Sequence, residues 1–77
     1  MNREELIEQI IRLIRENADV DEVTEQSSLI DDLDMASIEI LTFVGELEDE
    51  LDLTIPQKVL NEVATVGELA DAVLALA

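Results

Sequence analysis

The sequence contains no cysteine and no histidine. Without cysteine the chain can form neither a disulfide framework nor a thiolate metal site. Without histidine it lacks the commonest general base and the commonest metal ligand, so it cannot assemble a Ser-His-Asp triad. Chemistry by the chain alone would depend on carboxylates, hydroxyls and four basic residues. We therefore expect a protein that is not an enzyme.

Aromatic residues and positive charges are also scarce. Phe43 is the only aromatic residue, so the core must be built from aliphatic side chains, mainly Leu, Ile and Val. Twenty acidic residues against four basic ones give a net charge of −16. Phosphate repulsion opposes nucleic-acid binding, and anionic membrane surfaces are disfavoured for the same reason. The natural partner for such a surface is a basic patch on another protein.

Long apolar runs are missing as well. No run approaches the roughly 18 residues of a membrane span, and the charged first residues do not form a signal peptide. Hydrophobic residues still make up 48% of the 77 residues, which is too many for a disordered acidic tail. We expect one domain over residues 1–77, a monomer in the cytoplasm with no membrane insertion.

Apolar periodicity predicts three main helices and one short helix. Asn2 is a candidate N-cap with Glu5 at the capping-box position, and Thr65 with Glu68 forms a second capping box. Leu69, Val73 and Leu76 form the predicted apolar stripe of the last helix. The predicted bounds are Asn2 to about Arg15, Ser37 to about Asp52, Gln57 to Glu62, and Thr65 to about Leu76. These bounds indicate an all-α fold, a small four-helix bundle.

A long acidic connection, from Asn17 to about Ala36, separates the first two helices. Connections of this length are often functional in compact domains. We expect a short helical turn at Val20–Thr24. Apolar side chains should anchor the connection to the core, and they are Val20, Val23, Leu29, Ile30 and Leu33.

The second helix combines an apolar stripe with charges of a single sign. The stripe is predicted to consist of Leu41, Val44, Leu47 and Leu51, with Ile40 and Phe43 beside it. Its six charged residues are all acidic, and like charges on one helix lower its stability, most of all near the negative helix end. Partner recognition is the obvious reason to keep them.

A dense group of carboxylates, Asp31, Asp32 and Asp34, precedes this helix. An EF-hand loop needs glycine at its sixth position, but counting from Asp32 that position is Ser37. The sequence therefore predicts no specific metal site. Weak, nonspecific cation binding and a plain solvated acidic face both remain open.

Ser37, at the predicted start of the second helix, has two interpretations. Serine is a preferred N-cap, typically worth about 1 kcal/mol over alanine. Alternatively its hydroxyl carries a phosphate ester, which the free N–H groups and positive end of the helix would favour. Position alone does not separate the two.

The surrounding pattern resembles the acyl carrier protein family. Leu29–Leu33, then Ser37-Ile38, then a Glu-rich helix ending in Leu51–Pro56, agrees in spacing without a gap. The resemblance implies that Ser37 is esterified by 4′-phosphopantetheine, transferred from coenzyme A by a phosphopantetheinyl transferase. It further implies that the arm's thiol holds acyl groups as thioesters for acyl-loading and acyl-processing enzymes with basic docking patches, in fatty acid, polyketide or related specialised biosynthesis.

Several positions depart from the family pattern. Ala36 replaces the usual aspartate before the serine, and Asp34 replaces a glycine. Ile38, Thr42 and Gly45 replace a leucine, a glutamate and an apolar residue. The residues expected to dock partners are Asp34, Ile38, Glu39, Leu41, Thr42, Gly45, Glu46, Glu48 and Asp49. Two other hypotheses remain: an unmodified carrier-like adaptor for basic partners, and an acidic helical protein that responds to divalent cations.

Overall fold

The computed structural model describes residues 2–77, and its secondary structure is helical throughout. Within these residues the only strand-like feature is an isolated bridge between Ser28 and Thr65. The helices are α1 (Arg3–Asn17), α2 (Ser37–Leu51), α3 (Gln57–Glu62) and α4 (Val66–Leu76). The predicted all-α fold, with three main helices and one short one, is confirmed.

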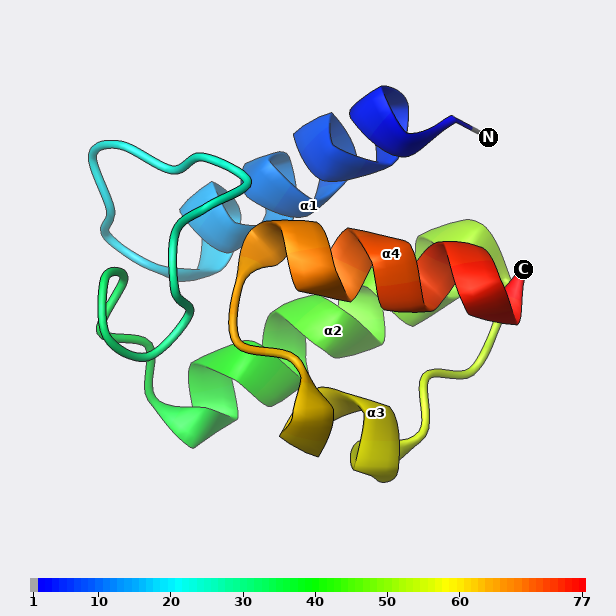
Figure 1. The fold of residues 1–77 in the computed structure, drawn as a ribbon. Coiled ribbons are helices and arrows are strands. Elements are labelled where there is room, and N and C mark those ends of the chain that lie inside the picture. The colour runs from blue at the N-terminus through cyan, green and yellow to red at the C-terminus, as the bar shows by residue number, and fades with distance from the viewer. Residues whose placement is uncertain (1) are drawn as a thin grey trace.

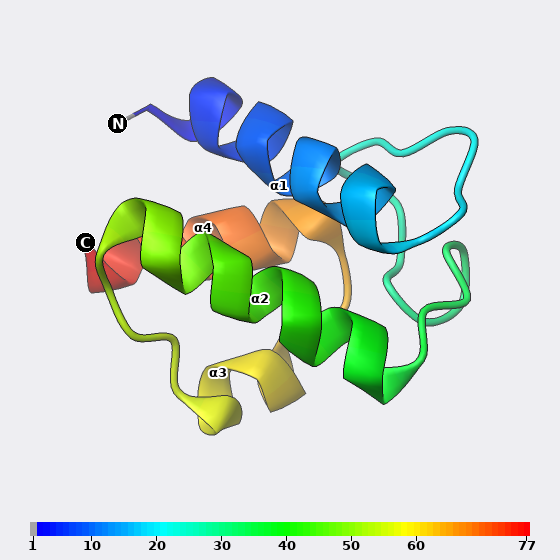
Figure 2. The same ribbon diagram turned by 180° about the vertical axis from the view of Figure 1, so that it is seen from behind.

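Helix α1 packs against both α4 and α2, and α3 lies on the side of these helices away from α1 (Figures 1 and 2). The long connection and the start of α2 lie at one end of the bundle, while the start of α1 and the end of α4 lie at the other. None of the helices in residues 2–77 has the length and apolar character needed to cross a bilayer.

The core is aliphatic around a single aromatic ring. Phe43 is fully buried, together with side chains from α1, α2 and α4. The completely buried residues are Leu6, Ile10, Leu13, Ile14, Phe43, Leu47, Val66, Leu69, Ala70 and Val73. No polar or charged residue is buried among the described residues, so the acidic side chains all reach solvent.

Two leucines predicted for the core lie outside it. Leu41 is 49% exposed, because the buried stripe of α2 is centred on Phe43, Val44 and Leu47 and Leu41 lies about 100° round the helix from its middle. Leu76 is 40% exposed at the end of α4. Both placements correct the predicted stripes.

The connection from residue 18 to residue 36 forms turns at positions other than the predicted one. Val20–Thr24 is not helical. Instead Thr24 and Ser27 bond to each other: the Thr24 N–H donates to Ser27 Oγ at 3.0 Å, and the Ser27 N–H donates to the Thr24 carbonyl at 3.1 Å. Side chains that satisfy the backbone locally compete with helix, and here the turn forms around them.

Most of the predicted anchors of this connection are confirmed. Val23, Leu29 and Leu33 are buried. Ile30 is the exception, with 66% of its surface exposed. Met35, which was not predicted as an anchor, is buried as well.

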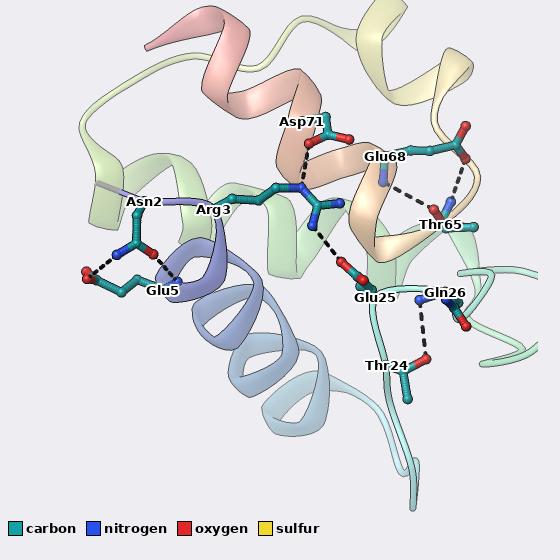
Figure 3. A network of polar contacts seen from close by, with 9 residues as sticks. All are labelled: Asn2, Arg3, Glu5, Thr24, Glu25, Gln26, Thr65, Glu68 and Asp71. Carbon is teal, nitrogen blue, oxygen red and sulfur yellow. Dashed lines mark hydrogen bonds and ion pairs between the residues drawn. The ribbon is translucent and has the colours of Figure 1, made fainter.

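The predicted caps form at both outer helices (Figure 3). The Asn2 side chain accepts from the Glu5 N–H at 2.8 Å, and the Glu5 carboxylate accepts from the Asn2 side-chain amide at 2.7 Å. Thr65 Oγ1 accepts from the Glu68 N–H at 3.1 Å, and Glu68 accepts from the Thr65 N–H at 3.0 Å. These bonds satisfy N–H groups that a helix start leaves without partners.

Arg3 links three segments of the chain (Figure 3). Its guanidinium donates to Asp71 of α4 at 2.7 Å and to Glu25 of the connection at 2.6 Å. These bonds, the one to Asp71 first, raise the pKa of the Arg3 side chain above its ordinary value. Close by, the Gly67 N–H donates to the Glu25 carbonyl at 2.7 Å. The connection is thereby tied to α1 and α4 together.

Candidate functional site

Ser37 is the first residue of α2, not its cap. The N-cap is Ala36, whose backbone is extended. The Ser37 side chain is exposed and forms no hydrogen bond within residues 2–77. The interpretation of Ser37 as an N-cap is therefore wrong, because a first-turn side chain does not occupy the capping position.

The start of α2 is only half capped. Alanine has no side-chain acceptor, so no side chain at position 36 accepts a hydrogen bond from the N–H groups of the first turn. Glu39 supplies the other half of a capping box, because its carboxylate accepts from the Ala36 N–H at 2.8 Å. The Glu39 carboxylate thus stabilises the start of the helix on which Ser37 lies.

The chain's other two serines differ from Ser37 in their hydrogen bonds. Ser27 Oγ accepts from the Thr24 N–H at 3.0 Å, and Ser28 Oγ accepts from the Asp31 N–H at 3.1 Å. Both hydroxyls stabilise turns of the connection. Of the three serines, Ser37 has the hydroxyl that is not used by the fold.

The segment before Ser37 fixes where this hydroxyl lies. Asp34 has a φ of 50°, in the left-handed region that favours glycine. Met35 then turns into the core, and its N–H donates to the Leu29 carbonyl at 3.1 Å. A sharp turn followed by a buried anchor leaves Ser37 at the surface. A glycine would adopt this φ without the strain that a side chain brings.

Ser37 is one of the residues that line a surface hollow. Its volume is about 180 Å³, and it is lined by Ile30, Ser37, Ile40, Leu41, Gln57, Leu60 and Asn61. A neighbouring cavity of about 220 Å³ shares Ile30, Ile40 and Leu60 with it and extends to Leu29, Val63 and Ala64. Apolar side chains therefore continue from Ser37 into the space between the connection, α2 and α3.

The nine residues predicted to dock partners differ in their exposure and in their hydrogen bonds within the chain. Five of them share the exposed side of α2, at helical spacing from Ser37: Ile38, Leu41, Thr42, Gly45 and Asp49. Ile38 is the most exposed of these, at 70%. Asp34 is exposed in the connection just before them.

Three of the predicted docking acids have partners within the chain. Besides Glu39, Glu46 accepts from the Asn17 amide of α1 at 3.3 Å. The Glu48 carboxylate accepts from the Ile55 N–H at 2.6 Å, in the connection that leads to α3. These three carboxylates thus already have hydrogen-bond partners within the chain, while the exposed Ile30, which was not predicted, lines the hollow beside Ser37.

Comparison with known proteins identifies the family. Residues 5–73 match the family described as phosphopantetheine attachment site. The chain belongs to the acyl carrier protein family. It is 37% identical over 70 residues to the acyl carrier protein of Lactobacillus acidophilus, with 88% of each chain covered. It is 34% identical over 70 residues to that of Thermotoga maritima, with 88% of this chain and 86% of the relative covered.

A solved acyl carrier protein structure, from Enterococcus faecalis, matches the fold with a TM-score of 0.80 at 33% identity. The match covers 100% of both chains. As an acyl carrier protein, this chain is a carrier with covalently bound 4′-phosphopantetheine and not an enzyme. The arm supplies the thiol that a chain without cysteine lacks. Acyl carrier proteins interact with phosphopantetheinyl transferases and with acyl-processing enzymes.

The residues around Ser37 fit such a group. An exposed hydroxyl without a partner is available for the ester, and the N-terminal end of α2 offers positive charge to a phosphate. The bordering hollow has no charged residue in its lining.

Proposed function

We propose that Ser37 carries the 4′-phosphopantetheine arm. The observation that carries the proposal is the hydroxyl of Ser37, exposed at the first residue of α2 and not used by the fold. In the loading reaction the Ser37 oxygen bonds to the phosphorus of coenzyme A that bears the pantetheine. The bond from that phosphorus to the adenosine bisphosphate breaks, and the hydroxyl proton passes to a base of the transferase or to solvent.

With the arm in place, the chain holds acyl intermediates as thioesters and presents them to enzymes of fatty acid, polyketide or related specialised biosynthesis. The neighbouring cavity of about 220 Å³ supports shelter for part of an acyl chain, because aliphatic residues make up most of its lining. The core contains one aromatic residue, so flexible aliphatic side chains surround this space.

The experiment is a mass measurement after incubation with coenzyme A and a broad-specificity transferase. We expect a gain of one phosphopantetheine group, lost in Ser37→Ala and retained in Ser28→Ala. No gain under conditions that load a control carrier, or a gain that survives Ser37→Ala, would contradict the proposal.

Partner docking is proposed for the exposed side of α2 next to Ser37. Ile38 and Leu41 supply apolar surface, and Asp34 and Asp49 supply negative charge for a basic patch. We expect Leu41→Ala to slow loading by the transferase. Leu76→Ala is the matched control, because it removes an exposed leucine from α4. Equal rates for the two variants would argue against this surface.

The hypothesis of an unmodified adaptor rests on Ala36, and it disagrees with the family match, which implies a covalently bound 4′-phosphopantetheine. This hypothesis expects Ser37→Ala to leave biological function intact. Complementation with that variant tests it, because a carrier loses all function with its attachment point.

A further inference from the structure

One side of α2 is uncharged over the turns that follow Ser37. At about 100° per residue, Ile38, Thr42 and Gly45 fall within about 60° of arc, on the side of the helix opposite its buried stripe. Ile38 is 70% exposed, and Leu41 beside them is 49% exposed. The Thr42 hydroxyl donates to the Ile38 carbonyl at 2.7 Å, so its proton is already bonded within the helix. Ile38, Leu41, Thr42 and Gly45 together form the uncharged face of α2, in a chain with 20 acidic residues.

The nearest acids of α2 lie to either side of this face and bond within the chain. Glu39 accepts from the backbone N–H before the helix at 2.8 Å, and Glu46 accepts from the Asn17 amide of α1 at 3.3 Å. On the other side, Glu48 accepts from the Ile55 N–H at 2.6 Å. A partner could draw these carboxylates onto the uncharged face only by breaking those bonds.

The enzyme that loads Ser37 must lie against this face. Its active site has to reach the Ser37 hydroxyl, and Ile38 is the next residue of the same exposed helix turn. A basic side chain pressed against Ile38 and Leu41 would lose water without gaining a counter-charge, which is unfavourable. An apolar surface in the same place would remove the exposed areas of both side chains from water, which is favourable.

We propose that the uncharged face of α2 selects a transferase whose surface next to its active site is apolar, with Ile38 as the central contact, and discriminates against one whose surface there is basic. The proposal rests on the proposed attachment at Ser37. Asp34 and Asp49 are exposed at the two ends of the face and attract positive charge at the rim of the contact. Long-range attraction therefore speeds the encounter, while short-range contact selects the partner.

The test measures loading by two transferases, one with an apolar and one with a basic surface around its active site. Mass measurement first establishes that the unaltered protein accepts the arm and that Ser37→Ala does not, so a failure of the proposed attachment is seen separately. The kcat/KM of loading is then measured with each transferase for the unaltered protein and for three variants.

Ile38→Ala should lower kcat/KM about tenfold with the apolar transferase, mainly through KM, because a central apolar contact is lost. With the basic transferase the same variant should change kcat/KM little. Leu76→Ala is the matched control, since it removes an exposed leucine from the far end of α4, and it should change neither value. Ile38 is mostly exposed, so thermal unfolding of Ile38→Ala should match that of the unaltered protein.

Thr42→Glu adds an acid to the uncharged face and should act in opposite directions on the two enzymes. It should raise kcat/KM with the basic transferase and lower it with the apolar one. Gln26→Glu adds the same charge beside α4 and controls for net charge, so it should leave the ratio of the two kcat/KM values unchanged. Equal losses with both transferases in Ile38→Ala would overturn the proposal. So would an unchanged ratio in Thr42→Glu.

Discussion

At the scale of single residues, Gly45 and Gly67 both lie in helices but have different surroundings. A methyl group added at Gly45 would meet nothing within 4 Å. At Gly67 it would lie 3.0 Å from the Glu25 carbonyl oxygen and 3.2 Å from the Arg3 guanidinium. Gly67 therefore permits the close approach of the connection to α4. No close contact within the chain requires glycine at position 45, and Gly45 lies on the surface proposed for docking.

The two glycines give opposite predictions. Gly45→Ala should raise the free energy of unfolding by about 1 kcal/mol, the usual difference between alanine and glycine inside a helix. Gly67→Ala should lower it by about 1–3 kcal/mol, because the backbone carbonyl of Glu25 must move. Urea denaturation of both variants measures the difference. A stabilised Gly67→Ala protein would show that the close approach relaxes without penalty.

Asp34 and Asp52 are the described non-glycine residues with positive φ, at 50° and 54°. Asp52 caps the C-terminal end of α2, where its carboxylate also faces the negative end of the helix. The left-handed backbone conformation and the negative charge at the C-terminal end of α2 thus both make Asp52 unfavourable for stability.

Replacing Asp52 should therefore stabilise the protein. We expect Asp52→Gly to raise the free energy of unfolding by about 1 kcal/mol, and Asp52→Asn by about 0.5 kcal/mol because only the charge is removed. Asp21→Gly controls for the lost charge, since Asp21 is exposed and does not have a positive φ. Thermal unfolding compares the three. Equal gains in Asp21→Gly and Asp52→Gly would assign the effect to net charge alone.

At the scale of the element, the acids of α2 have different roles on different sides. Glu39 bonds to the backbone before the helix, and Glu48 bonds to the Ile55 N–H after it. Glu50 accepts from Arg12 of α1 at 2.6 Å. Asp49, between Glu48 and Glu50, is exposed and has no ion pair within residues 2–77.

Adjacent acids of α2 should therefore respond differently to truncation. Glu48→Ala should lower the free energy of unfolding by about 1–3 kcal/mol, because the partly buried Ile55 N–H loses a charged acceptor. Asp49→Ala should leave stability unchanged or slightly higher, since it removes one of several like charges. Urea denaturation measures both. If Glu48→Ala were as stable as Asp49→Ala, the bond to Ile55 would contribute nothing to the fold.

At the scale of the whole molecule, repulsion between like charges is opposed by a few ion pairs that join separate segments of the chain. A net charge of −16 on a chain with a radius of gyration of 11.0 Å favours expansion. Arg3 counters it by joining α1, α4 and the connection. Its bonds to Asp71 and Glu25 raise the pKa of the Arg3 side chain, so the guanidinium stays charged at every ordinary pH.

Arg3→Gln should therefore lower the melting temperature more than Arg15→Gln. Both arginines are exposed on α1 and both changes make the net charge more negative, but only Arg3 joins segments far apart in sequence. The difference should shrink in high salt, because the ion pairs of Arg3 are solvent-exposed. Melting curves of both variants at low and high sodium chloride test this. Equal decreases in melting temperature for Arg3→Gln and Arg15→Gln would show that the ion pairs of Arg3 do not stabilise the fold.

Added salt should raise the melting temperature of the unaltered protein by screening its repulsion. At equal ionic strength, magnesium chloride should act much as sodium chloride does, since the described residues contain no group of three or more potential metal ligands. A melting temperature independent of salt would contradict the screening argument. A large additional shift with magnesium would favour the cation-responsive hypothesis.

Helix bounds were predictable because capping and periodicity are local. Asn2 and Thr65 both cap the helices that their sequences predict. Leu41 and Leu76 were assigned to the wrong face because a leucine at the margin of a stripe is buried only if a neighbouring element covers it. The same limit applies to Glu48, whose partner lies seven residues away across a turn.

The sequence by itself determined the helical class, the acidic surface and the position of the candidate serine, because these follow from composition, local spacing and a gapless motif. Tertiary structure alone decided that the Ser37 hydroxyl is not used by the fold, and that uncharged residues of α3 lie beside Ser37. Those facts depend on how the connection and α3 fold back against α2, and contacts between segments distant in sequence leave no local pattern.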